Sequence, residues 1–229
     1  MFVENFIRST IVSILALVLG TASLPAPWKQ QDIGAVAVHG QTNYDGVKFI
    51  IKAAGNATDS TKDEFHFAYF PLESEGEITA RLVPQPGSRF SKMGLMMRES
   101  LVVNSIFASL ILNPGKSGKI EAPKWQSMLV SRSTAGKPMQ VKNTGPELSE
   151  PIVTSGGLTG EYWLRLVRKY NSFYAFTSLD GKTWTLLGST FVEMKKKFFA
   201  GIAVSSGVKD VTTTVMFDNI TIPGWKSGE

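Results

Sequence analysis

The sequence predicts an all-β protein, a sandwich of two antiparallel sheets preceded by a hydrophobic leader helix. Short segments of alternating or continuous apolar residues recur along the chain, and clusters of Gly, Asn, Asp, Pro and Ser separate them. No segment after the leader keeps a helical period for long. About a dozen such segments are too many for one hairpin sheet, so two packed sheets are the economical arrangement.

Residues 1–23 predict a secretory signal peptide or a membrane anchor. No residue between Ser9 and Trp28 is charged, and a short apolar run follows Arg8. Small residues after this run place a cleavage region near Ala22 or Ser23. Because the run is short for a membrane span, cleavage is the leading interpretation, and an uncleaved segment would be the expected contact with a membrane. We therefore expect a secreted, periplasmic or cell-surface protein.

Residues 24–225 predict one sandwich domain, with residues 226–229 as a tail. Hydrophobic residues make up 43% of the chain and charged residues 19%, a balance that excludes a disordered protein. The absence of cysteine excludes disulfides, a thiolate nucleophile and a cysteine-ligated zinc site. The net charge of +5 comes without dense blocks of Lys and Arg, so nucleic acid is not an expected partner.

Period-two alternation identifies the strands. In Glu77–Val83, the side chains of Ile78, Ala80 and Leu82 share one face, and Met93–Arg98 repeats the pattern. Further strands are predicted at Ala35–His39, Val47–Ala53, Phe65–Phe70, Ser105–Leu112, Gln126–Arg132, Tyr162–Arg168, Phe173–Ser178, Thr183–Leu187, Phe198–Ser205 and Thr212–Ile222.

Turn residues order these strands. The segment 162–188 predicts three consecutive antiparallel strands, joined by turns at Tyr170-Asn171 and Asp180-Gly181. Asp-Gly suits a tight turn because Gly adopts positive φ without a Cβ clash. The stretch Ser133–Gly160 is rich in Gly, Ser, Thr and Pro, and predicts a long loop or a ragged sheet edge rather than a linker between domains.

Several segments, in their order and spacing, resemble a bacterial domain of the concanavalin A-like lectin/glucanase superfamily. The resemblance is to the sandwich family that includes β-xylosidase C-terminal domains and many accessory modules of secreted proteins. It implies a jelly-roll sandwich with one concave face, but no particular chemistry. GNATDSTKDEF (55–65) departs from a Gly-Asp-Ile-Trp-like stretch usual in the family. The segments that carry the resemblance are LPAPWKQQDIG (24–34), FHFAYFPLESEGEITARLV (65–83), SKMGLMMRES (91–100), FFAGIAVSSG (198–207), VMFDNITI (215–222) and the hairpin segment.

The acidic residues give little support for catalysis. A glycosidase needs two carboxylates facing each other across the sugar, and catalytic relatives with this fold carry a Glu-x-Asp-x-Glu run on one strand. This chain has no such run. Its nearest clusters are Asp63-Glu64 and the loop Glu73–Glu77, whose carboxylates are expected to face water. We expect a non-catalytic protein, with a glycoside hydrolase as the least favoured alternative.

A structural calcium ion is the one cofactor that the sequence suggests. Many sandwich modules use oxygen ligands to pin the first strand to the last. Asp32 lies just before the first predicted strand and Asp218 in the last, so the two could share an ion if these strands pair. The alternative is that both aspartates bond to local backbone groups. His39 and His66 lie in different strands and show no metal-ligand spacing.

Strand arginines suggest the ligand-binding face. Arg81, Arg98 and Arg165 have apolar neighbours, so alternation places each opposite the core-facing residues of its strand. On a concave sheet they could bond to sugar hydroxyls, while Trp125 and Tyr174 stack on a pyranose ring. The alternative is that these arginines pair with acidic side chains and keep an exposed sheet soluble.

These patterns predict a non-catalytic carbohydrate-binding module that binds a glycan or surface polysaccharide on its concave sheet. A structural or protein-interaction sandwich without a small ligand is the main alternative. The two differ in one measurable property, since only the first has affinity for sugar. The sequence does not predict the oligomeric state.

Overall fold

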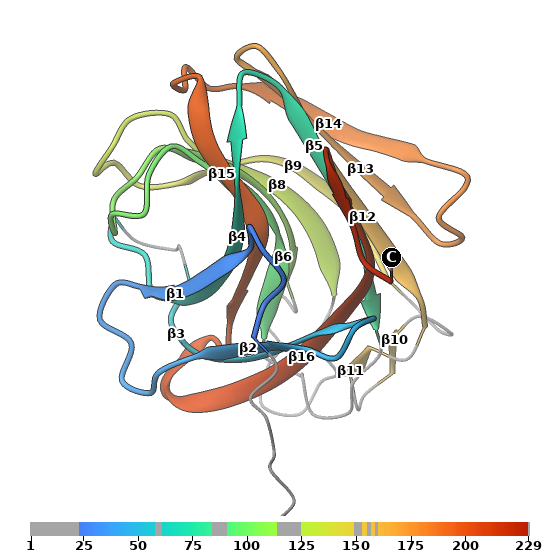
Figure 1. Ribbon diagram of the computed structural model, residues 1–229. Coiled ribbons are helices and arrows are strands. Elements are labelled where there is room, and N and C mark those ends of the chain that lie inside the picture. The colour runs from blue at the N-terminus through green and yellow to red at the C-terminus, as the bar shows by residue number, and fades with distance from the viewer. Residues whose placement is uncertain are drawn as a thin grey trace, which may run out of the picture.

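The computed structural model describes residues 23–57, 61–83, 91–113, 125–148, 153–154, 157–158 and 160–228. Every regular element in these residues is a β-strand (Figure 1). Among them there is accordingly no helix long and apolar enough to cross a membrane. The predicted leader and its helix lie outside the described residues.

Two antiparallel sheets make up the fold. We call them sheet A, with seven strands, and sheet B, with eight. Across sheet A the order is β1 (Lys29–Ile33), β4 (Phe65–Glu73), β15 (Lys197–Ser205), β6 (Lys92–Arg98), β7 (Phe107–Asn113), β8 (Gln126–Arg132) and β9 (Gln140–Glu147). Across sheet B it is β14 (Thr185–Phe191), β13 (Ser172–Ser178), β12 (Tyr162–Lys169), β5 (Gly76–Val83), β16 (Val208–Ile222), β3 (Phe49–Gly55) and β2 (Gln41–Tyr44), with β17 (Trp225–Lys226) paired to β16. A separate pair joins β10 (Val153–Thr154) to β11 (Gly157–Leu158).

The main core lies between the two sheets. Ile78, Ala80 and Leu82 of β5 are buried there, as alternation predicts, and meet Leu95 and Met97 of β6 from the other sheet. Alternating side chains of two facing sheets interdigitate in this way in sandwiches. The predicted two-sheet sandwich is therefore confirmed.

Sheet A also carries apolar side chains on its outward face. Phe67 of β4, Met96 of β6 and Val130 of β8 form a second buried cluster there, together with Leu101 and Met139 from connecting segments. Burial on both faces explains why β4 and β7 are nearly continuous apolar runs instead of alternating ones.

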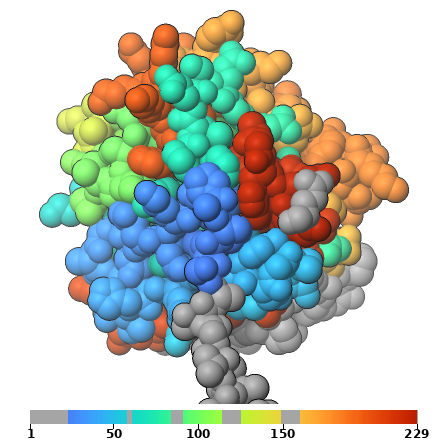
Figure 2. Space-filling view, in the orientation of Figure 1, coloured from blue at the N-terminus to red at the C-terminus, as the bar shows by residue number. Residues whose placement is uncertain are grey.

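The N-terminal strands and the C-terminal segment lie side by side on the surface (Figure 2). The ring of Trp225 packs 5.3 Å from that of Trp28 and 5.8 Å from that of Phe49, between ring centroids. The backbone N–H of Gly228 donates to the hydroxyl of Tyr44. Trp225 and Lys226 also pair with β16, so the C-terminal segment is bonded to sheet B.

One strand prediction was wrong, and one pair of alternatives is now decided. Ala35–His39 forms bends instead of a strand, because β1 ends earlier, at Ile33, before the left-handed Gly34. A Cβ on Gly34 would lie 2.0 Å from the carbonyl oxygen of Asp63, so the chain turns in a space that only glycine fits. The stretch 133–160 contains the edge strand β9, which has irregular register with β8 and is thus a ragged edge, one of the two predicted alternatives.

Candidate functional site

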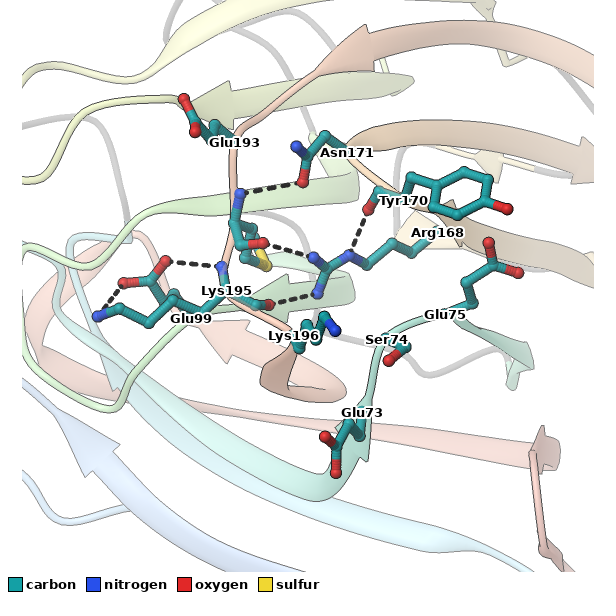
Figure 3. Close-up of a pocket in the computed structure, with 11 residues that line it drawn as sticks. Glu73, Ser74, Glu75, Glu99, Arg168, Tyr170, Asn171, Glu193, Lys195 and Lys196 are labelled. Atoms are coloured by element: carbon teal, nitrogen blue, oxygen red, sulfur yellow. Dashed lines mark hydrogen bonds and ion pairs between the residues drawn. The ribbon is translucent and has the colours of Figure 1, made fainter.

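A cleft of about 950 Å³ opens at the end of the sandwich that is uppermost in Figure 1. We call it the end cleft. Its walls come from the β4–β5 turn, the residue after β6, the β12–β13 turn and the β14–β15 connection (Figure 3). Its volume lies in the range of about 300–1,000 Å³ typical of ligand pockets. The lining residues are Glu73, Ser74, Glu75, Glu99, Arg168, Tyr170, Asn171, Glu193, Met194, Lys195 and Lys196.

Arg168 connects two walls of the end cleft, the β12–β13 turn and the β14–β15 connection. Its Nε donates to the carbonyl oxygen of Tyr170 at 2.7 Å, and its Nη1 and Nη2 donate to those of Lys195 and Met194 at 2.9 and 2.6 Å. The guanidinium also lies 4.5 Å from the ring centroid of Phe198. Burial lowers the pKa of Arg168, although nearby carboxylates oppose the shift. Because its donors are committed to backbone carbonyls, Arg168 positions the two turns instead of facing a ligand.

Glu99 fixes the β14–β15 connection from the other side. Its carboxylate accepts from the backbone N–H of Lys195 at 3.0 Å and forms an ion pair with the Nζ of the same residue at 3.0 Å. Burial raises the pKa of Glu99, but the hydrogen bonds from Lys195 outweigh it, and the net pKa is lowered. Glu99 is thus a hydrogen-bond acceptor that stays ionised at neutral pH.

Two further backbone contacts complete the frame. The side-chain oxygen of Asn171 accepts from the N–H of Met194, and the N–H of Ser74 donates to the carbonyl of Lys196 at 2.8 Å. The connection is therefore bonded to three different segments around the cleft. A cleft framed in this way is formed before any ligand arrives, which lowers the entropic cost of binding.

The groups that face solvent in the end cleft differ from those that build it. Tyr170 is 80% exposed, and its backbone adopts a left-handed conformation, with φ of 55°, at the turn. Non-glycine residues rarely adopt this conformation, and such residues gather at functional sites and turns. Glu73, Glu75, Glu193 and Lys196 are also exposed along the walls. The cleft thus offers one flat ring with acceptors and donors of both charges.

Arg81 lies on the outward face of sheet B, away from the end cleft. Its Nε and Nη2 donate to the two carboxylate oxygens of Asp218 at 2.7 and 2.6 Å, and its Nη1 pairs with Glu161. The guanidinium lies 5.8 Å from the ring centroid of Trp163. Asp218 itself is buried, so this bidentate pair is mostly shielded from solvent.

Arg165 and Tyr174 occupy the same outward face, on neighbouring strands. Arg165 donates to the carboxylate of Glu77 at 2.7 Å, and its guanidinium lies 5.7 and 5.8 Å from the ring centroids of Phe176 and Trp184. Arg81 and Arg165, the two arginines on this outward face that were predicted to bind a ligand, therefore pair with acidic side chains, as the alternative interpretation of the sequence expects.

The other two predicted ligand residues are not accessible. Arg98 is fully buried on the outward face of sheet A, where it bonds to Asp63 and to backbone carbonyls. Trp125 is fully buried in the core between the sheets. The prediction that these residues line one open face with Arg81 is therefore wrong, because connecting segments cover the outward side of Arg98 and Trp125 points inward.

The structure does not bring the predicted calcium ligands together. β1, which carries Asp32, pairs only with β4 of sheet A among the described strands, whereas Asp218 lies in β16 of sheet B. Asp32 instead bonds to His66 at 2.7 Å, to His39 at 3.0 Å and to the N–H of Gly40. The described residues contain no group of three or more potential ligands arranged to hold a metal.

Sequence reasoning missed the end cleft, although its pieces were visible. The sequence predicts the loop Glu73–Glu77 and the turn Tyr170-Asn171, but no pattern in it links either of them to the basic Lys195–Lys197. The available signal was strand direction: the connections β4–β5, β12–β13 and β14–β15 all lie at the same end of the antiparallel strands that they join. Counting strand reversals could have placed these turns together, but not shown that they enclose a cleft.

Comparisons with known proteins identify the fold. No family model and no curated protein matches the sequence. A functionally unknown protein from Saccharomyces cerevisiae matches with a TM-score of 0.63 and 13% identity, over 84% of this chain and 95% of the other.

Larger proteins also contain this fold. The GH43 protein BlXynB of Bacillus licheniformis matches with a TM-score of 0.54 and 14% identity over 84% of this chain, and the Bacteroides ovatus xyloglucan PUL protein GH43B with 0.50 and 14% over 75%. This chain spans 38% and 32% of those two proteins. At these identities the likeness shows the fold alone: an antiparallel two-sheet β-sandwich, consistent with the predicted concanavalin A-like architecture.

Proposed function

We propose that the protein is a non-catalytic carbohydrate-binding module that binds a neutral polysaccharide in the end cleft. The observation that carries the proposal is the exposed Tyr170 ring on the wall of a cleft that Arg168 and Glu99 hold in place. The site differs from the concave-face arginines that the sequence suggested, whereas the class of ligand is the same.

The chemistry of the cleft suits a sugar. A pyranose presents an apolar C–H face, on which an aromatic ring can stack, and a rim of hydroxyls that both donate and accept hydrogen bonds. Tyr170 supplies the flat ring, the carboxylates of Glu73, Glu75 and Glu193 supply acceptors, and Lys196 supplies donors. The mixed charge of these groups favours a neutral ligand over a strongly anionic or cationic one.

The comparisons support the proposal through the context of the fold. The matching sandwich accounts for about a third of the GH43 chains, so in those proteins it is one part of a larger molecule. One of them is described by its link to xyloglucan, a polysaccharide. We propose accordingly that this chain is similar to the accessory sandwiches of β-xylosidase-like proteins, and that it is exported or surface-attached through residues 1–23.

The properties of Glu99 do not suit the general acid of a glycosidase. The general acid of a glycosidase needs a raised pKa so that it is protonated at the working pH. Glu99 has a lowered pKa and an ion pair with Lys195, which suit an acceptor of hydrogen bonds.

A structural or protein-interaction sandwich is the second candidate. It is favoured by the outward face of sheet B, where Arg81 and Arg165 are paired with acidic side chains and are not directed at an empty site. This candidate predicts no affinity for any polysaccharide.

Affinity electrophoresis with xylan, xyloglucan and β-1,3-glucan, alongside polygalacturonate, tests the proposal. At least one neutral polymer should retard the protein, and Tyr170→Ala should weaken that binding about tenfold, equivalent to roughly 1.4 kcal/mol. Tyr174→Ala on sheet B is the matched control and should bind as the wild type does. The absence of binding to every polymer, or wild-type binding by Tyr170→Ala, would overturn the proposal.

A further inference from the structure

A second hollow adjoins the end cleft. Its volume is about 560 Å³, and it follows the end of β4 and the start of β15 as far as Pro223, which comes after β16. Glu73 and Glu99 line both hollows. The two hollows therefore lie side by side and share part of their lining.

The two hollows differ in chemistry. Charged and amide side chains dominate the end cleft, whereas Pro71, Leu72, Phe199 and Pro223 give the second hollow a mainly apolar wall. A ligand that spans both must therefore carry polar groups and apolar faces along its length. Successive sugar units provide this combination, because each unit has hydroxyls around its edge and C–H groups on its faces.

Exposed residues border both hollows. Tyr170, which lines only the end cleft, is 80% exposed, and Pro223, which lines only the second hollow, is also exposed. A pocket for the end of a chain has a closed side that buries the terminal unit. A groove bordered by exposed side chains at both ends instead lets a chain enter at one end and leave at the other.

We propose that the two hollows form one groove that binds an internal run of several sugar units in a polysaccharide chain. This inference rests on the proposed function and adds the mode of recognition. Each hollow alone is as large as an ordinary ligand pocket of about 300–1,000 Å³, so the pair exceeds what a single sugar unit needs. Affinity should therefore grow with ligand length until both hollows are filled.

Titration calorimetry with oligomers of one to eight units of xylan, xyloglucan and β-1,3-glucan tests this mode. For the polymer that binds, affinity should rise at least tenfold from the shortest oligomer that binds to the longest, and blocking the reducing end chemically should leave it unchanged. Equal affinity for short and long oligomers, or loss of binding when the chain end is blocked, would overturn the internal mode. The proposed function would survive either result.

Variants locate the two halves of the groove. Tyr170→Ala should lower the affinity for short and long oligomers by similar factors. Phe199→Ala in the second hollow should lower the affinity only for the long oligomers. Lys197→Ala, an exposed substitution in the same hollow, provides a second test that leaves the packing of Phe199 intact. If neither Phe199→Ala nor Lys197→Ala changes the affinity for long oligomers, the proposed groove is contradicted. If no oligomer or polymer binds the wild type, the proposed function fails as well.

Discussion

The outward faces of the two sheets carry arginines in similar sequence patterns but in opposite surroundings. Arg98 on sheet A is fully buried, whereas the side chain of Arg165 on sheet B is 34% exposed and pairs with the equally accessible Glu77. Both follow the same rule of alternation, with Met97 before Arg98 and leucines on either side of Arg165. The difference lies in what covers each face, and strand periodicity does not encode it.

The covered face of sheet A holds a closed cluster of charges. The buried carboxylate of Asp63 bonds to Arg132 at 2.7 and 3.0 Å and to Arg98 at 3.4 Å. Burial raises the pKa of Asp63 and lowers that of Arg98 to about 10. The arginines also donate to carbonyls in the connecting segments, including those of Val102 and Lys137. The cluster thus fastens two segments over the sheet.

A strand arginine can therefore bind covering segments to its sheet, as on sheet A, or pair with an acidic side chain at the surface, as on sheet B. On sheet A, the charged partners Asp63, Arg98 and Arg132 are all fully buried, so removing one charge leaves the opposite charges with neither a charged partner nor solvent. On sheet B, water can replace a lost partner, so the cost is small. Stability measurements can distinguish these two situations.

The largest effect is expected from Asp63→Asn. The substitution leaves the guanidinium groups of Arg98 and Arg132 buried without a carboxylate, which should lower the free energy of unfolding by about 3–5 kcal/mol. Urea denaturation measures the change. Asp210→Asn, at an exposed aspartate, is the control and should stay near the wild type. If Asp63→Asn lowers the free energy of unfolding by less than about 1 kcal/mol, the cluster does not hold the covering segments on sheet A.

An intermediate effect is expected from Asp218→Asn. The buried Asp218 accepts two charge-assisted hydrogen bonds from Arg81, but Arg81 is partly exposed and keeps Glu161. The free energy of unfolding should fall by about 1.5–3 kcal/mol. Glu161→Gln removes only the exposed half of the network and should cost less than about 1 kcal/mol. Equal losses for the two variants in the same denaturation experiment would refute this ranking.

A pH dependence should come from the buried His66, whose partner is Asp32. Burial lowers the pKa of His66 from 6.5, and the hydrogen bond to Asp32 opposes this shift without cancelling it. The unfolded chain therefore binds a proton more readily than the folded one, so stability is full above about pH 6.5 and falls as the pH decreases below it. The melting temperature followed from pH 8 to pH 5 should decline in the wild type and more gently in His66→Gln. If the melting temperature falls equally steeply with pH in both proteins, His66 is not the source of the pH dependence.

The smallest effect is expected from Arg165→Met. Methionine keeps apolar contact with Phe176 and Trp184 and loses only the exposed pair with Glu77. The free energy of unfolding should change by less than about 1 kcal/mol in urea denaturation, as for other exposed ion pairs. A loss as large as that of Asp63→Asn would remove the contrast between the two faces.

Much of the fold followed from local pattern. The period-two segment Glu77–Val83 became β5, and the predicted turns at Tyr170-Asn171 and Asp180-Gly181 separate β12, β13 and β14 in antiparallel pairs. The apolar run Ala35–His39 suggested a strand, but tight packing at Gly34 ends β1 before this run. Edge strand β9 was hidden by its polar composition and by Pro146, which an edge tolerates because one side needs no ladder bonds.

The sequence by itself determined that this protein is a sandwich of two antiparallel sheets, because alternation and turn residues act within a few positions of each other. Only the tertiary structure decided that Arg98 is covered, that Asp32 meets His66 instead of Asp218, and that Tyr170 stands over a cleft. These outcomes depend on segments far apart in the chain that meet at one end or one face. Periodicity shows on which side of a strand a residue points, but not what lies there.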